Sequence, residues 1–143
     1  MKTNIATDSL QSQRLLRCGV SADTADMARY EDDEVPMMPW DWTTGSYGGT
    51  FPAWSLSALL SDILPCNISD NEIDYSLFLQ RRRSADNTPT WELSYYNLEY
   101  DATMLFVEVA DPVEACVLMA EKLTANGYKL NGCPCREKGG ENE

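Results

Sequence analysis

One stretch of sequence decides how this chain folds, Phe51-Pro-Ala-Trp-Ser-Leu-Ser-Ala-Leu-Leu-Ser-Asp-Ile-Leu-Pro65. From Leu56 to Leu64 its apolar residues recur at i, i+3, i+4, i+7 and i+8, which is one face of an α-helix. Ser55 is a natural N-cap, because its hydroxyl can accept from the free amides of the first turn. Pro65 disfavours helix in the residue before it, so the helix should end near Leu64. The stretch therefore predicts a short helix that packs in the core.

Trp54, directly before this helix, has two interpretations. Trp54 and Leu59 have the spacing of a hydrophobic staple, in which both side chains pack at the start of the helix. Alternatively, Trp54 stays exposed and anchors a partner protein, because tryptophan is favoured at interfaces. A leucine stripe at this spacing favours the core interpretation.

The N-terminal residues predict two helices. Residues 1–7 should be a frayed end. A first helix is expected over residues 9–18, with Asp8 and Gln11 at capping-box spacing and Gly19 in the left-handed position after it. Ser21 can cap a second helix over residues 22–30.

Residues 31–51 predict a long loop that is rich in acids and aromatics. It begins with Glu31-Asp-Asp-Glu34, continues between two prolines and then becomes rich in glycine. The aromatics either fold back over the leucine stripe or bind a partner, since large aromatic side chains seek burial. The candidate partner-binding residues, together with Trp54, are Trp40, Trp42 and Tyr47.

The C-terminal half predicts three strands and a helix. Residues 74–82 and 90–96 alternate in polarity and can pair as an antiparallel hairpin, after a polar connector over residues 66–72. A more apolar strand over residues 104–109 should be central or covered. Asp111 and Glu114 then predict a helix that ends at Asn126-Gly127, with Tyr128 closing a Schellman motif. The tail, residues 131–143, is expected to be mobile.

The charge of the chain disfavours nucleic acid and membrane surfaces. The net charge is −12, and the acidic residues are spread along the sequence. One basic cluster stands out, Arg81-Arg82-Arg83. It is a weaker candidate site that can meet phosphate or an acidic partner, but charges at the end of a strand more often prevent edge-to-edge association.

The sequence gives little support for catalysis. It contains no histidine, so Ser–His and Cys–His nucleophiles are absent, and no phosphate or dinucleotide motif is present. We therefore expect a non-enzymatic protein with no cofactor and no metal. The five cysteines are odd in number and irregularly spaced, which favours reduced thiols, although Cys133 and Cys135 leave metal binding or oxidation open. Neither a signal peptide nor a membrane-spanning run is apparent, so the expected location is the cytoplasm.

Several strings resemble one family of short proteins. They are Gln11-Ser-Gln-Arg-Leu-Leu16, Thr24-Ala-Asp-Met27, Pro52-Ala-Trp-Ser-Leu-Ser-Ala-Leu-Leu60, Leu64-Pro65 and Asn126-Gly-Tyr128. They resemble uncharacterised proteins from prophages and mobile elements of gut bacteria, over most of residues 9–130. The family has no assigned activity, so the resemblance implies a genomic context and no mechanism. The Cys-Pro-Cys tail is not part of the family pattern.

Together these observations predict a single α+β domain over residues 1–130. A three-stranded antiparallel sheet should pack against the C-terminal helix and the short central helix, with the N-terminal helix pair at the side. The expected function is that of a small acidic accessory protein of a phage or mobile element. It would act by binding another protein, as in an inhibitor of a basic host protein. The alternatives are nucleic-acid binding through Arg81–Arg83 with aromatic stacking, and an enzyme with a carboxylate site; a homo-oligomer also remains open.

Overall fold

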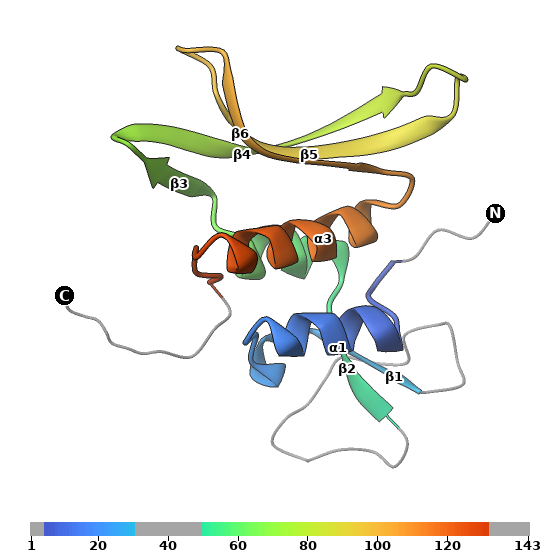
Figure 1. Cartoon of the computed structure of the whole chain (residues 1–143). Coiled ribbons are helices and arrows are strands. Elements are labelled where there is room, and N and C mark those ends of the chain that lie inside the picture. Colours follow the sequence, from blue (N-terminus) through green and yellow to red (C-terminus); the bar gives the residue numbers. More distant parts are fainter. Residues whose placement is uncertain (1–4, 31–49, 132–143) are drawn as a thin grey trace.

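The structure, a computed structural model, describes residues 5–30 and 50–131, and the fold is α+β (Figure 1). The elements are arranged so that two strands follow the N-terminal helices, four consecutive strands follow the central helix, and a helix comes after them. In order they are α1 (Ser9–Arg17), the short 3₁₀ helix η1 (Ala22–Thr24), β1 (Met27–Tyr30), β2 (Thr50–Ala53), α2 (Leu56–Ala58), the π-helix η3 (Leu59–Ile63), β3 (Asn67–Asp70), β4 (Ile73–Arg83), β5 (Pro89–Asn97), β6 (Ala102–Val109) and α3 (Pro112–Ala125).

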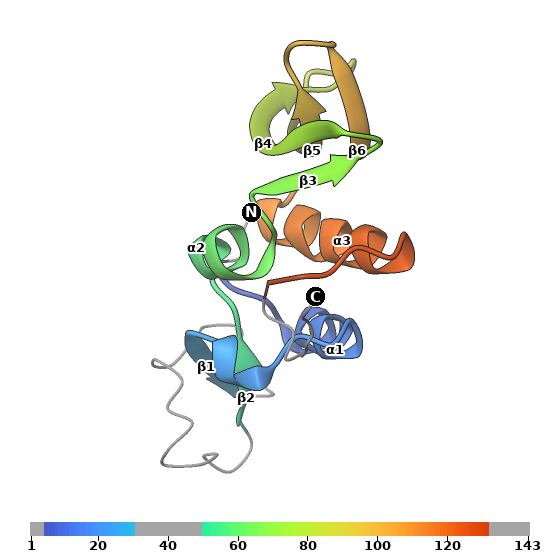
Figure 2. The same cartoon turned by 90° about the vertical axis from the view of Figure 1, so that its left-hand side faces the viewer.

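The elements form layers. An antiparallel sheet in the order β3-β4-β5-β6 lies on one side of α3. On the other side of α3 lie α1 and the two-stranded sheet β1-β2, and α2 with η3 runs alongside α3 (Figures 1 and 2). Among the described elements, none covers the face of the four-stranded sheet that points away from α3.

The prediction of three strands is wrong by one strand. The expected polar connector, residues 66–72, contains β3, which pairs with β4 so that Ile68 lies opposite Tyr75. Asn71 and Glu72 form the two-residue turn between them, both with positive φ (54° and 67°), the conformation that joins tightly paired strands. The sequence did not indicate this hairpin, because its turn contains no glycine. Of the two positions predicted for the strand over residues 104–109, central or covered, the central one is wrong, because β6 lies at the edge of the sheet, while α3 covers one of its faces.

The second predicted helix, over residues 22–30, is wrong as well. Ser21 caps only the short turn η1, and Met27 to Tyr30 then form β1, which pairs with β2. Ala28 and Arg29 are buried in this pair, so tertiary pairing outweighs the weak helical pattern of the segment.

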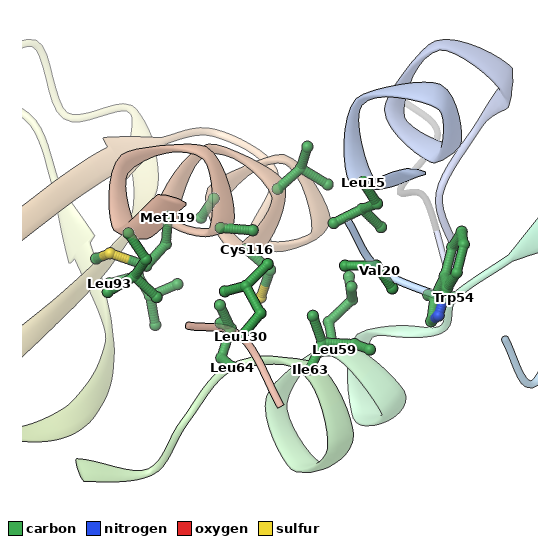
Figure 3. Close-up of a cluster of buried hydrophobic side chains, with 14 of the residues drawn as sticks. Leu15, Val20, Trp54, Leu59, Ile63, Leu64, Leu93, Cys116, Met119 and Leu130 are labelled. Atoms are coloured by element: carbon green, nitrogen blue, oxygen red, sulfur yellow. The ribbon is translucent and has the colours of Figure 1, made fainter. Parts of the chain in front are cut away.

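The central stretch folds largely as predicted. Ser55 caps its helix by accepting a hydrogen bond from the amide of Ala58 at 3.1 Å. The helix is α-helical for only one turn and then widens into η3, whose end at Leu64 is marked by the change to extended backbone. Leu59, Ile63 and Leu64 are buried together with side chains of α1, α3 and β5 (Figure 3).

The capping motifs predicted at the start and the end of α1 and α3 are confirmed. Asp8 and Gln11 form the reciprocal capping box of α1, and Gly19 has a positive φ of 97°. Asp111 accepts from the amide of Glu114, and after α3 the amide of Tyr128 donates to the carbonyl of Leu123 at 2.9 Å, as a Schellman motif requires.

The chain ends that the structure describes are held more firmly than expected. Ala6 and Thr7 are buried, so the prediction of a frayed end is wrong for these residues. At the other end Leu130 is buried, and the amide of Asn131 donates to the carbonyl of Ile63 at 2.9 Å. The rest of the predicted tail lies outside the described residues.

Candidate protein-binding surface

The outer face of the four-stranded sheet, which points away from α3, carries an aromatic row. Strand alternation places Tyr75, Leu77 and Leu79 of β4 toward α3, and the residues between them on the outer face. In the observed register Ser94 of β5 lies between Phe78 of β4 and Phe106 of β6. Three adjacent strands therefore bring two phenylalanines to either side of one small side chain.

A groove lies on this outer face, with a volume of about 600 Å³. Ser94, 2% exposed, lies low in the row, while Phe78 and Phe106 are 47% and 45% exposed. The rings of Phe78 and Tyr96 lie 6.0 Å apart between centroids and are tilted by 40°. Figure 1 shows the ends of the β4–β5 and β5–β6 hairpins bending away from α3, so this part of the outer face is concave. The groove is lined by Ser76, Phe78, Gln80, Glu92, Ser94, Tyr96, Leu98 and Thr103.

Exposed apolar side chains are concentrated here. Of the seven large hydrophobic side chains that are exposed in the described part of the chain, four lie on the outer face or in the adjoining β5–β6 turn: Phe78, Leu98, Tyr100 and Phe106. Large aromatics on a solvent-facing sheet mark interaction sites more often than scattered surface residues do.

The β5–β6 turn is held in one shape. The hydroxyl of Tyr96 donates to Asp101 at 2.6 Å, and the amide of Tyr100 donates to the side-chain oxygen of Asn97 at 2.7 Å. Asp101 has a positive φ of 52°. The turn thus presents Leu98 and Tyr100 from a fixed backbone, which lowers the entropy that a partner must overcome on binding.

The surroundings of the groove are acidic. Of the residues that the structure describes, Arg82 is the one basic residue on the outer face and in the β5–β6 turn. Its guanidinium pairs with Glu92 at 2.7 Å. That hydrogen bond raises the pKa of Arg82. The acids on the same face and turn are Asp74, Glu92, Glu99, Asp101 and Glu108.

The predicted basic cluster does not form one patch. Arg81 lies over the ring of Trp91 at 5.4 Å, on the α3 side of the sheet. Arg82 lies on the outer face with Glu92, and Arg83 donates to the carbonyl of Asn87 at 3.2 Å. Each arginine is engaged with its own hairpin, which agrees with the interpretation that they protect a strand end.

The exposed-anchor interpretation of Trp54 is wrong. Its side chain is fully buried at the end of the core cluster farthest from Leu93, and its indole Nε1 donates to Thr24 at 2.9 Å (Figure 3). The reason is the apolar face of the helix that follows Trp54. Its leucines and the indole pack in the same core. The other predicted partner-binding residues, Trp40, Trp42 and Tyr47, lie outside the described residues, as do the acidic run 31–34, Cys133 and Cys135.

The buried titratable groups of the described chain serve the core. Burial raises the pKa of the Cys116 thiol to about 12, which keeps it neutral and unreactive. Burial also raises the pKa of Tyr95, whose hydroxyl donates to the carbonyl of Pro65 at 2.6 Å. In residues 5–30 and 50–131 no three cysteine or carboxylate side chains converge as a metal site would require. None of the helices described is both long enough and apolar enough to cross a membrane.

The sequence did contain a signal for the outer face. Phe78 and Tyr96 occupy the polar phase of their alternating strands: Phe78 lies between Ser76 and Gln80, and Tyr96 follows Glu92 and Ser94. A large aromatic at a position that should face solvent is informative, and here two neighbouring strands both have one. Phe106 could not be assigned in this way, because β6 is apolar in both phases.

Comparisons of this chain with protein-family models, with curated proteins and with solved structures found no match. The class that the structure defines is an α+β protein with one open, aromatic sheet face. The functional proposal therefore depends on the residues of that face.

Proposed function

We propose that this chain is a small non-enzymatic binding protein, and that another protein docks on the outer face of its four-stranded sheet. The observation that supports this most is the exposed row of Phe78 and Phe106 across three hydrogen-bonded strands, beside a groove of about 600 Å³. Solvent-facing strands normally carry polar side chains, and aromatics are the residues that most often anchor protein interfaces.

The charges favour a protein over a nucleic acid as the partner. The five acids around the groove would repel a phosphate backbone, and the single arginine is already paired with Glu92. A basic protein would instead be attracted to this face over a distance set by the ionic strength.

The resemblance to proteins of prophages and mobile elements supports a more specific version of this proposal. The protein would be an accessory factor that works in the cytoplasm of a bacterial host. By covering a basic surface of a host protein, it would inhibit that protein. The acidic groove is the part of the chain suited to such a target.

A site-specific crosslink tests the proposal. Phe106 is replaced by the photoreactive analogue p-benzoylphenylalanine, and Leu10, an equally apolar position on α1 that is 69% exposed, receives the same analogue as the control. In cells of a native host we expect a crosslinked protein at position 106, absent at position 10, that is lost when Phe78→Ser is added. Equal crosslinking at both positions, or none at 106, would contradict the proposal. A mobility shift of single-stranded DNA or RNA that fades with salt would support the nucleic-acid alternative instead.

A further inference from the structure

The edge strand β6 is positioned to extend the sheet. We propose that the partner contributes an extended, basic segment that pairs with β6 as a fifth strand and places an apolar side chain against Phe106. This inference rests on the proposed function and specifies how the same surface would bind its partner.

The backbone of β6 is free on one side in the described structure. β6 pairs with β5 from Trp91 opposite Val109 to Asn97 opposite Ala102, and it is the last strand in the sheet order. In an antiparallel ladder every second residue directs its N–H and C=O away from its neighbour. These groups form a template for one more strand.

β6 has incompletely buried apolar side chains on both faces of the sheet. Leu105 and Val109 are only half-buried on the α3 side, and Phe106 is exposed on the outer side. Natural edge strands are usually protected by charges, proline or a bulge, and the part of β6 from Leu105 to Val109 contains no proline, no basic residue and one charge, Glu108. The register shift between Tyr95 and Tyr96 leaves Met104 of β6 without a partner, so β6 has a bulge there, and the ladder is regular only from Leu105 to Val109. An added strand would bury apolar surface on both sides.

The opposite edge of the sheet, formed by β3 and the free part of β4, is less suited to pairing with a basic strand. β3 covers β4 only as far as Ser76, so the rest of that edge is also without a neighbouring strand in the described structure. That stretch of β4 ends in Arg81, Arg82 and Arg83, which would repel a basic segment. Of the two edges, β6 is the one suited to pairing.

The basic character of the added strand follows from a pair of like charges. Glu92 and Glu108 lie directly opposite each other on β5 and β6, an arrangement that is unfavourable without a cation nearby. Arg82 pairs directly with Glu92 and reaches Glu108 only through a weaker electrostatic interaction, while the hydrogen bond that Glu108 accepts comes from the uncharged hydroxyl of Thr90 at 2.6 Å. One cation thus serves two carboxylates, and a lysine or arginine on a fifth strand, next to Glu108, would supply a second one. A second copy of this chain fits poorly, because its net charge is also −12.

The probe for the test is the peptide acetyl-Thr-Lys-Val-Phe-Val-Lys-Thr-amide, whose phenylalanine can lie over Phe106 with a lysine beside Glu108 in either strand direction. Two control peptides replace both lysines by glutamate, or carry N-methyl groups on alternate backbone amides, one version for each phase. Binding to the full chain is followed by amide hydrogen exchange. The protein variants are Phe106→Lys and the control Leu10→Lys, which places the same charge on α1.

We expect the lysine peptide to slow exchange at alternate amides between 105 and 109. Phe106→Lys and the glutamate peptide should each weaken binding by about tenfold or more, the equivalent of one lost contact, while Leu10→Lys should bind normally. The proposal is overturned if the lysine peptide does not bind, if protection falls on residues 79–83, or if both N-methylated peptides bind as well as the parent. If that last result accompanies a specific crosslink at position 106, the binding function survives and only strand pairing fails. Protection of β6 that rises with protein concentration without peptide would assign the edge to a second copy.

Discussion

Arg14 of α1 holds Glu121 of α3 through two hydrogen bonds, from Nε to Oε2 at 3.0 Å and from Nη2 to Oε1 at 2.7 Å. The third nitrogen of the same guanidinium, Nη1, lies 3.0 Å from Glu114, which is two turns before Glu121 on the same face of α3. Gln11 also donates to Glu114, at 2.7 Å. This cluster joins the N-terminal layer to the helix that supports the sheet.

Replacing Arg14 should lower the stability of the fold, because it removes the ion pairs between α1 and α3. In Arg14→Met the apolar stem is retained, but two carboxylates lose their shared cation. Because charged, bidentate hydrogen bonds are the strong ones, we expect the free energy of unfolding to fall by about 2 kcal/mol. Urea denaturation measures the change, and Arg17→Met, which removes an exposed arginine of the same helix that acts on Glu121 only through its charge, should change it by about 0.5 kcal/mol or less. Equal effects of the two substitutions would show that the cluster contributes nothing special.

The same cluster predicts a pH dependence. The hydrogen bonds from Arg14 lower the pKa of Glu121 below its ordinary value of 4.5. The unfolded chain therefore takes up this proton at a higher pH than the folded chain. The stabilisation is complete above the ordinary pKa and is lost as the pH falls through the folded value. Arg14 itself stays charged throughout this range.

The stability difference between the unsubstituted protein and Arg14→Met should accordingly be largest near neutral pH and shrink in acid. Urea titrations at about pH 7, 5, 4 and 3 measure it. A difference that stays constant down to pH 3 would mean that Arg14 acts through packing of its stem and not through Glu121.

Trp54 should matter for stability. It is fully buried, and both its indole and its backbone amide are hydrogen-bonded, to Thr24 and Thr7. We expect Trp54→Ala to reduce the free energy of unfolding by about 3–5 kcal/mol, through the cavity that it leaves. Trp54→Phe should cost less, since it fills most of the space and loses the bond to Thr24. An Ala variant as stable as the parent would restore the exposed-anchor interpretation.

The parts of the fold that the sequence predicted are those whose signals are local. Ser55, Asp8 and Asp111 each cap the helix that follows them, because capping depends on amides within the next turn. The hairpin of β4 and β5 was equally readable, since alternation extends over many residues on both strands.

The parts that it did not predict depend on distant partners. β1 exists because Met27 to Tyr30 pairs with Thr50 to Ala53, and nothing in the first segment shows this pairing. Asn71 and Glu72 adopt positive φ although neither is glycine, so the sequence did not predict the β3–β4 hairpin. The candidate surface is similar, because Phe78 and Phe106 become neighbours of Ser94 only when the register of three strands is known.

Gly127 offers a test of backbone conformation that is separate from packing. Its φ is +86°, and a Cβ built at this position would meet no atom within 4 Å. Gly127→Ala should therefore reduce the free energy of unfolding by about 1 kcal/mol, through the strain of a left-handed residue alone. Gly127→Asn should cost less, because asparagine tolerates this conformation better than alanine. Thermal or urea unfolding of the three proteins gives the order. If alanine costs no more than asparagine, the C-terminus of α3 does not depend on the left-handed turn. If both substitutions cost several kcal/mol, the packing of Tyr128 and Leu130 against the core is disrupted as well.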